Sequence, residues 1–101
     1  MVMHIKTKTD IAQLAISDEI ETLNENIEIV ASLLKDVNIP FLAATNAEKL
    51  LTMFIQIRDL FEDEEVQLEK KNVILEKLPL LYLQISFIKE QIKSGVNAWE
   101  I

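Results

Sequence analysis

The sequence contains no cysteine, one histidine and one glycine, and each shortage excludes a class of site. Without cysteine there is no disulfide, no thiolate nucleophile and no cysteine-ligated metal. A single glycine rules out the glycine-rich loops that hold phosphate groups. His4 lies outside every predicted helix, and no serine has a base within identifiable reach, so no catalytic triad can be drawn. We therefore predict that the protein is not an enzyme and binds no cofactor or metal.

Long apolar runs and basic clusters are also missing. The longest apolar stretch, residues 78–88, falls short of the roughly 20 residues that span a bilayer. Residues 1–10 lack the apolar segment of about 7 to 15 residues found in signal peptides. Ten basic residues, only one of them arginine, stand against seventeen acids, for a net charge of −7. The short apolar runs predict a cytoplasmic protein with no membrane span. The excess of acids predicts no direct binding to nucleic acid.

What the sequence has in abundance is aliphatic side chains. Half of the 101 residues are apolar, and isoleucine and leucine occur fourteen times each. The length suits one domain with a core of modest size, and a chain this short covers so much aliphatic surface poorly. We predict a single helical domain over residues 1–101, with residues 1–9 as an N-terminal extension and residues 95–101 as a tail that carries Trp99.

The strongest pattern is an apolar seam between residues 10 and 37. Its members follow one another in steps of four and three, the heptad spacing of a helix packed on other helices. They are Ile16, Ile20, Leu23, Ile27, Val30, Leu34 and Val37. Asp10 is a candidate N-cap, and Pro40 disfavours the helical conformation at the residue before it. The pattern predicts a first helix over residues 10–37, roughly 42 Å long.

A second, shorter helix is predicted over residues 45–62. Thr45 and Glu48 have the spacing of a capping box, and the inner face again advances by three and four residues. That face consists of Ala47, Leu50, Phe54, Ile57 and Phe61. Four consecutive acids follow at residues 62–65. We interpret them as the first turn of the next helix, where the helix dipole favours negative charge, rather than as metal ligands.

A third helix is predicted over residues 64–94. Its seam passes Pro79 without a change of register, which favours one helix kinked at Pro79 over two short helices, with four helices as the alternative. The seam consists of Ile74, Leu78, Leu81, Ile85, Ile88 and Ile92. Gly95 suits the left-handed residue that ends a helix. The fold is thus predicted to be all-α, an antiparallel three-helix bundle in the order long, short, long.

Four acids form a stripe on the first helix, opposite its seam. This acidic stripe consists of Asp18, Glu21, Glu25 and Glu28, spaced three, four and three residues apart. Like charges at these spacings repel by a few tenths of a kcal/mol per pair. Two interpretations stay open: a solvated face, or a docking surface for a basic partner, including an enzyme groove that normally holds DNA or RNA.

Large apolar residues that lie off the seams predict a second surface. A second helix of about 16 residues, roughly 24 Å, cannot cover two neighbours of about 42 Å. A second copy related by a two-fold axis would cover the faces left open. We expect this self-interface to contain Ile29, Leu33, Leu80, Leu83 and Phe87.

These features predict a non-catalytic protein–protein interaction module. Such a module would be a small homo-oligomeric adaptor, a chaperone or an immunity-type inhibitor, acting as a homodimer on an unidentified protein partner. The alternative is an acidic inhibitor that mimics nucleic acid and occupies a basic groove of a DNA- or RNA-handling enzyme. No motif in the sequence separates the two.

Overall fold

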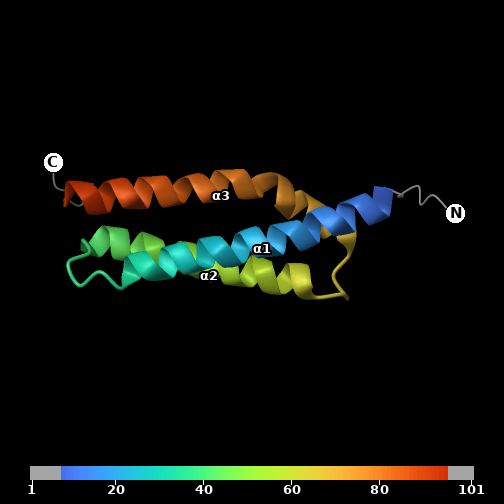
Figure 1. Cartoon of the computed structure of the whole chain (residues 1–101), viewed down its shortest axis with the longest axis horizontal. Coiled ribbons are helices and arrows are strands. Elements are labelled where there is room, and N and C mark those ends of the chain that lie inside the picture. Colours follow the sequence, from blue (N-terminus) through green and yellow to red (C-terminus); the bar gives the residue numbers. More distant parts are fainter. Residues whose placement is uncertain (1–7, 96–101) are drawn as a thin grey trace, which may run out of the picture.

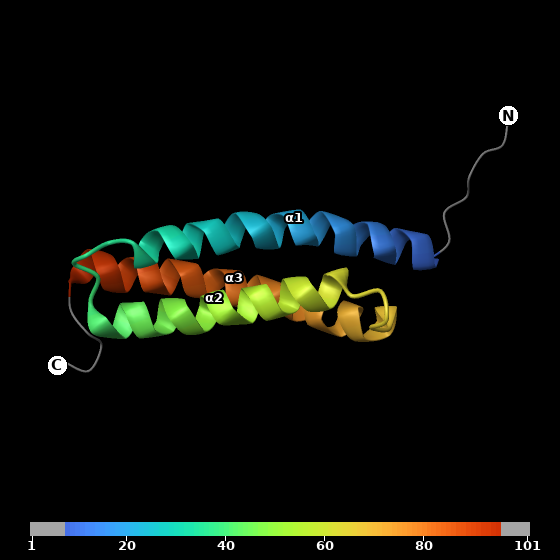
Figure 2. The same cartoon turned by 90° about the horizontal axis from the view of Figure 1, so that it is seen from below.

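The computed structural model describes residues 8–95, which form three helices and no strand (Figure 1). Helix α1 spans Lys8–Leu34, α2 spans Phe41–Glu62 and α3 spans Leu68–Ser94. All three pack against one another, and α2 runs antiparallel to α1 and α3 in both views (Figures 1 and 2). The predicted all-α three-helix bundle is confirmed, with helices of 27, 22 and 27 residues.

The core is formed by one seam from each helix. Heptad spacing returns the apolar side chains to the same side of each helix, where the two neighbouring helices bury them. The buried apolar residues are Ile16, Leu23 and Val30 of α1, Ala43, Ala47, Leu50, Phe54 and Phe61 of α2, and Leu78, Ile85 and Ile88 of α3. The predicted seams are confirmed apart from Val37, which is 94% exposed.

Helix α1 is displaced toward the N-terminus relative to its predicted bounds. It already includes residue 8, so Asp10 lies within the helix and does not cap it. It ends at Leu34 because the next residues form a turn around Asp36. The Asp36 carboxylate accepts a hydrogen bond from the Asn38 amide at 2.9 Å, and the Asp36 carbonyl accepts one from the Ile39 amide at 3.2 Å. This turn leaves Val37 outside the seam.

Helix α2 begins four residues earlier than predicted, at Phe41 directly after Pro40. Thr45 is therefore inside the helix, where its hydroxyl donates to the Phe41 carbonyl at 3.0 Å instead of capping the first turn. The seam of α2 also extends back to Ala43, which is fully buried four residues before Ala47. Packing of this alanine extends the helix past the predicted capping box.

The acidic run at residues 62–65 forms the connection between α2 and α3 rather than the start of α3. Glu62 is the last residue of α2, and α3 begins at Leu68. The Asp63 carboxylate accepts a hydrogen bond from the Glu65 amide at 2.9 Å, and the Asp63 carbonyl accepts one from the Val66 amide at 3.2 Å. Aspartate stabilises such turns by bonding its own backbone two residues on. This local bond competes successfully with helix formation.

Helix α3 continues through Pro79 as a single helix. One helix was the favoured prediction, and the kink at Pro79 stays a prediction. Gly95 ends the helix as expected, with φ of 69° and its amide directed at the carbonyls of Gln91 and Ile92, each at 3.2 Å. Of the predicted N-terminal extension, residues 8 and 9 belong to α1. Residues 1–7 and the predicted tail that carries Trp99 lie outside the described residues.

Candidate interaction surfaces

The side of α3 that points away from the core carries large apolar residues. We call this set the outer row of α3: Val73, Leu80, Leu83 and Phe87. These side chains are 53%, 66%, 54% and 61% exposed, respectively. Fully burying one such side chain is worth about 1.5–3 kcal/mol, so leaving four of them in water forgoes a large stabilisation. An exposed apolar group of this kind marks a candidate binding surface.

The outer row exists because α3 packs through one face only. Leu78, Ile85 and Ile88 turn toward α1 and α2 and are buried. Helices α1 and α2 pack more extensively on each other than either does on α3. Figure 2 shows α3 lying along this pair, with its remaining surface uncovered by another helix. The outer row is therefore left over once the three-helix core is complete.

The structure brings together three of the five residues predicted for the self-interface. Leu80, Leu83 and Phe87 share the outer row, and Ile29 of α1 is also exposed. Leu33 is half-buried and packs against the core of its own chain, which leaves less of it for a partner. Val73 was not predicted, although its position seven residues before Leu80 indicates that it shares the row.

The self-interface was predicted from a second helix that was taken to be too short, and that predicted length was wrong. Helix α2 has 22 residues, about 33 Å, against 27 residues and about 40 Å for its neighbours. It therefore covers most of their length. The stretch left uncovered belongs mainly to α1, whose first turns extend past the connection between α2 and α3 (Figure 2). Ile11 and Leu14, in these turns, are 56% and 50% exposed.

The acidic stripe faces solvent along the middle of α1. Its members Asp18, Glu21, Glu25 and Glu28 are all exposed. Among the described side chains, the ion pairs involve Arg58 and not the stripe. Ile11 and Leu14 precede the stripe in the same heptad phase, so the outer face of α1 changes from apolar to acidic along its length.

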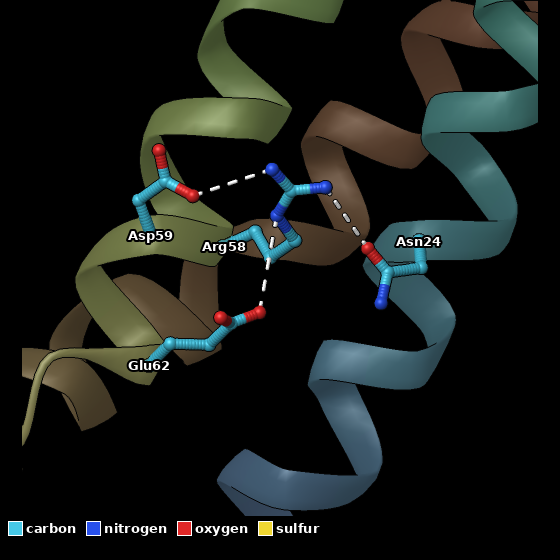
Figure 3. Close-up of polar contacts among 4 residues, drawn as sticks. All are labelled: Asn24, Arg58, Asp59 and Glu62. Carbon is cyan, nitrogen blue, oxygen red and sulfur yellow. Dashed lines mark hydrogen bonds and ion pairs between the residues drawn. The ribbon is translucent and has the colours of Figure 1, made fainter.

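Arg58, the sole arginine, links α2 to α1 by a hydrogen bond and forms no ion pair with the acidic stripe. One of its terminal nitrogens donates to Asn24 Oδ1 at 3.2 Å, and the other lies 3.3 Å from Asp59 Oδ1 (Figure 3). Its Nε lies 3.9 Å from Glu62 Oε1, one helical turn further on. The two acids neutralise the guanidinium on its own helix, so Asn24 is the group that links it to α1.

Lys71 is a buried charged residue that the sequence interpretation missed. Its side chain is 8% exposed, and Nζ donates to the Phe61 carbonyl at 3.0 Å. Phe61 lies in the last turn of α2, where helix carbonyls have no partner within the helix. The lysine therefore caps α2 from α3. The available signal was its place in the seam, three residues before Ile74 and seven before Leu78.

A second missed contact joins the two long helices. The Tyr82 hydroxyl of α3 donates to Glu19 Oε1 of α1 at 2.7 Å, and its ring lies 5.6 Å from that of Phe54 in α2. Burial raises the pKa of Tyr82, and so do the hydrogen bond to Glu19 and the negative charge of that carboxylate. Both residues stand directly beside seam positions, from which side chains reach a neighbouring helix.

The polar side chains of the described residues form no candidate metal site. Within residues 8–95, no three histidine, cysteine, aspartate or glutamate side chains are grouped so that they could hold a metal ion. In the same range, every buried polar side-chain atom has a hydrogen-bond partner. None of α1, α2 and α3 combines the length and apolarity that a membrane-crossing helix needs.

Comparison with known proteins adds no constraint on function. No protein family model matches the chain, and neither a curated protein nor a solved structure shows significant similarity to it. The candidate surfaces therefore rest on the chemistry of their own residues.

Proposed function

We propose that the protein is a non-catalytic protein–protein interaction module that works in the cytoplasm and binds through the outer row of α3. The exposure of Val73, Leu80, Leu83 and Phe87 on the side of α3 opposite its buried residues carries this proposal. A homo-oligomeric adaptor, a chaperone and an immunity-type inhibitor all need such a surface. None of these roles needs a reactive group.

Affinity capture from a native lysate tests the proposal. The bait is the whole chain, compared with the double variant Leu83→Glu and Phe87→Glu, which places two charges in the outer row. Burying those charges in a complex is unfavourable, so captured proteins should be lost. The matched control is Ile11→Glu with Leu14→Glu, because these two residues are apolar and about as exposed. An identical set of captured proteins with all three baits contradicts the proposal.

A second candidate function rests on the acidic stripe. Four exposed carboxylates without an ion pair extend over eleven residues of α1, about 15 Å. Such a surface attracts a basic groove and speeds association with it. In this alternative the protein mimics nucleic acid and inhibits an enzyme that handles DNA or RNA. Reversal of the stripe charges, described in the Discussion, tests it.

A further inference from the structure

The spacing of the outer row indicates what kind of surface can cover it. Val73, Leu80 and Phe87 recur every seven residues; Leu83 falls between the last two, and the acid Glu76 falls between the first two. This is the period at which one helix meets another, whereas an extended strand presents its side chains with a period of two. The outer row is therefore suited to a helix that carries apolar residues at the same period.

Charge opposes a second copy of this chain less along α3 than along α1. The chain carries a net charge of −7, yet α3 contains five lysines and three glutamates. Helix α1, in contrast, contains six acids and one lysine. Two copies that met through α1 would bring their acidic stripes together, and like charges would oppose assembly. Along α3 each copy carries a net charge of only +2, five lysines against three glutamates, and α3 is also where the apolar row lies.

Symmetry then fixes how two outer rows can meet. Leu80 is the midpoint of the row, seven residues from Val73 and seven from Phe87. In an antiparallel pair with its two-fold axis at Leu80, each Val73 lies level with Phe87 of the partner subunit. A small side chain then faces a large one at both ends, which suits close packing. Leu83 then lies level with Lys77 of the partner subunit, and the contact is identical on both subunits.

We infer that the outer row of α3 packs antiparallel on the same row of a second copy, with the two-fold axis near Leu80. This inference rests on the proposed function, because it names the partner of the same surface. A partner protein with a heptad helix of its own is the competing occupant. The two occupants are separated by measurements on the purified chain alone.

Sedimentation equilibrium over a range of concentrations tests self-association. The wild-type chain should have twice its mass of 11.6 kDa, and the variant with Leu83→Glu and Phe87→Glu should have the single mass. Circular dichroism verifies that this variant keeps its helices. Ile11→Glu with Leu14→Glu serves as the matched control, and it should remain a dimer.

Cysteine cross-linking tests the register, and the absence of native cysteine makes it specific. A disulfide requires two Cα atoms about 4.4–6.8 Å apart, which a residue beside a two-fold axis can meet with its own copy. Under mild oxidation Leu80→Cys should give a covalent dimer in high yield. Glu25→Cys, on the acidic stripe, should form almost no covalent dimer. Equal yields from both, or no cross-link at Leu80→Cys in a dimer of full mass, would overturn the register.

The outcomes also separate this inference from the proposed function. A wild-type chain that stays at 11.6 kDa throughout overturns the second copy as occupant. If captured proteins are still lost in the variant with Leu83→Glu and Phe87→Glu, the outer row remains a binding surface for another protein. A dimer that survives this variant shows that self-association uses a different surface. It overturns the inference, and the capture experiment then decides the proposed function independently.

Discussion

The outer faces of α1 and α3 share one spacing and differ in chemistry. Asp18, Glu21, Glu25 and Glu28 follow the heptad steps on α1. The outer row of α3 occupies the same kind of positions with apolar residues, except at Glu76. Both sets are exposed, and both helices have 27 residues. Toward the core the two helices are alike, with leucine, isoleucine or valine on each seam, apart from the buried Lys71 at the start of α3.

The fold therefore does not determine the chemistry of the outer faces. A charged face stays hydrated at little expense in stability, so the acidic stripe is compatible with a chain that works alone. Exposed leucine and phenylalanine gain stability only when something covers them. Of the two faces, the outer row of α3 therefore gives the stronger indication of a partner.

The largest effect is expected from the inner faces. Leu23 of α1 and Leu78 of α3 are both fully buried, so Leu23→Ala and Leu78→Ala should each lower the free energy of unfolding by about 2–5 kcal/mol. Urea denaturation followed by circular dichroism measures this. Ile11→Ala, at an exposed site, should stay within about 0.5 kcal/mol of the wild type. A much smaller loss for Leu78→Ala than for Leu23→Ala would show that α3 is less firmly packed, and the comparison would fail.

A smaller effect is expected from the hydrogen bond that joins α3 to α1. Tyr82→Phe removes the bond to Glu19 and should lower the free energy of unfolding by about 1 kcal/mol at neutral pH. The folded state raises the pKa of Tyr82, so the phenol binds its proton more tightly when folded than when unfolded. Its contribution is complete below the unfolded pKa of about 10 and declines as pH rises above it.

Alkaline denaturation of wild type and Tyr82→Phe checks this sign. The difference in free energy of unfolding between wild type and Tyr82→Phe should be constant from neutral pH to about pH 9 and should shrink above pH 10. Tyr82 is the only tyrosine, so its absorbance reports the same titration directly. A difference that grows with pH would contradict the assigned hydrogen bond.

Still smaller effects on stability are expected from the acidic stripe. Reversing Glu21, Glu25 and Glu28 to lysine should change the free energy of unfolding by less than about 0.5 kcal/mol, because exposed charges contribute little to folding. Binding of a basic partner should weaken sharply, mainly through a slower association rate. A triple reversal of equal charge outside the stripe is the control, at Glu48, Glu64 and Glu65. An unchanged set of captured proteins would leave the stripe as a solvated face and remove the nucleic-acid mimic.

The smallest effect is expected from salt. An aliphatic contact along the outer row should respond weakly to ionic strength, whereas a contact through the acidic stripe would strengthen as salt screens the repulsion. Light scattering from about 0.05 to 1 M salt measures the mass of the assembly. A fall to the monomer mass at high salt would falsify the aliphatic interface.

The seams were predictable from the sequence because burial imposes its period on each helix separately. Leu23, Phe54 and Leu78 could be placed in the core from spacing alone, and Leu80, Leu83 and Phe87 could be placed outside it by the same argument. Helix ends were less predictable, because several local rules compete there. At Thr45 the capping-box rule gave way to packing of Ala43, and at Asp63 a turn replaced the first turn of a helix.

Contacts between helices could not be predicted from the patterns. The bond from Tyr82 to Glu19 depends on how far α3 is displaced along α1 and how each is rotated about its axis. A periodic pattern within one helix contains neither quantity. Lys71 was different, since its seam position was visible in the sequence. The carbonyl it bonds lies at the end of α2, and the end of that helix had to be known first.

Enclosure of Lys71 between the ends of α2 and α3 has a consequence for amine chemistry. An acylating reagent reaches Nζ only when these two helix ends separate, because the nitrogen is buried and bonded to the Phe61 carbonyl. The exposed neighbour Lys70 reacts without any such opening. The ratio of the two labelling rates, read by peptide mass spectrometry, therefore reports how often this end of the bundle opens. The native chain thus contains its own probe of local unfolding, together with an internal standard one residue away.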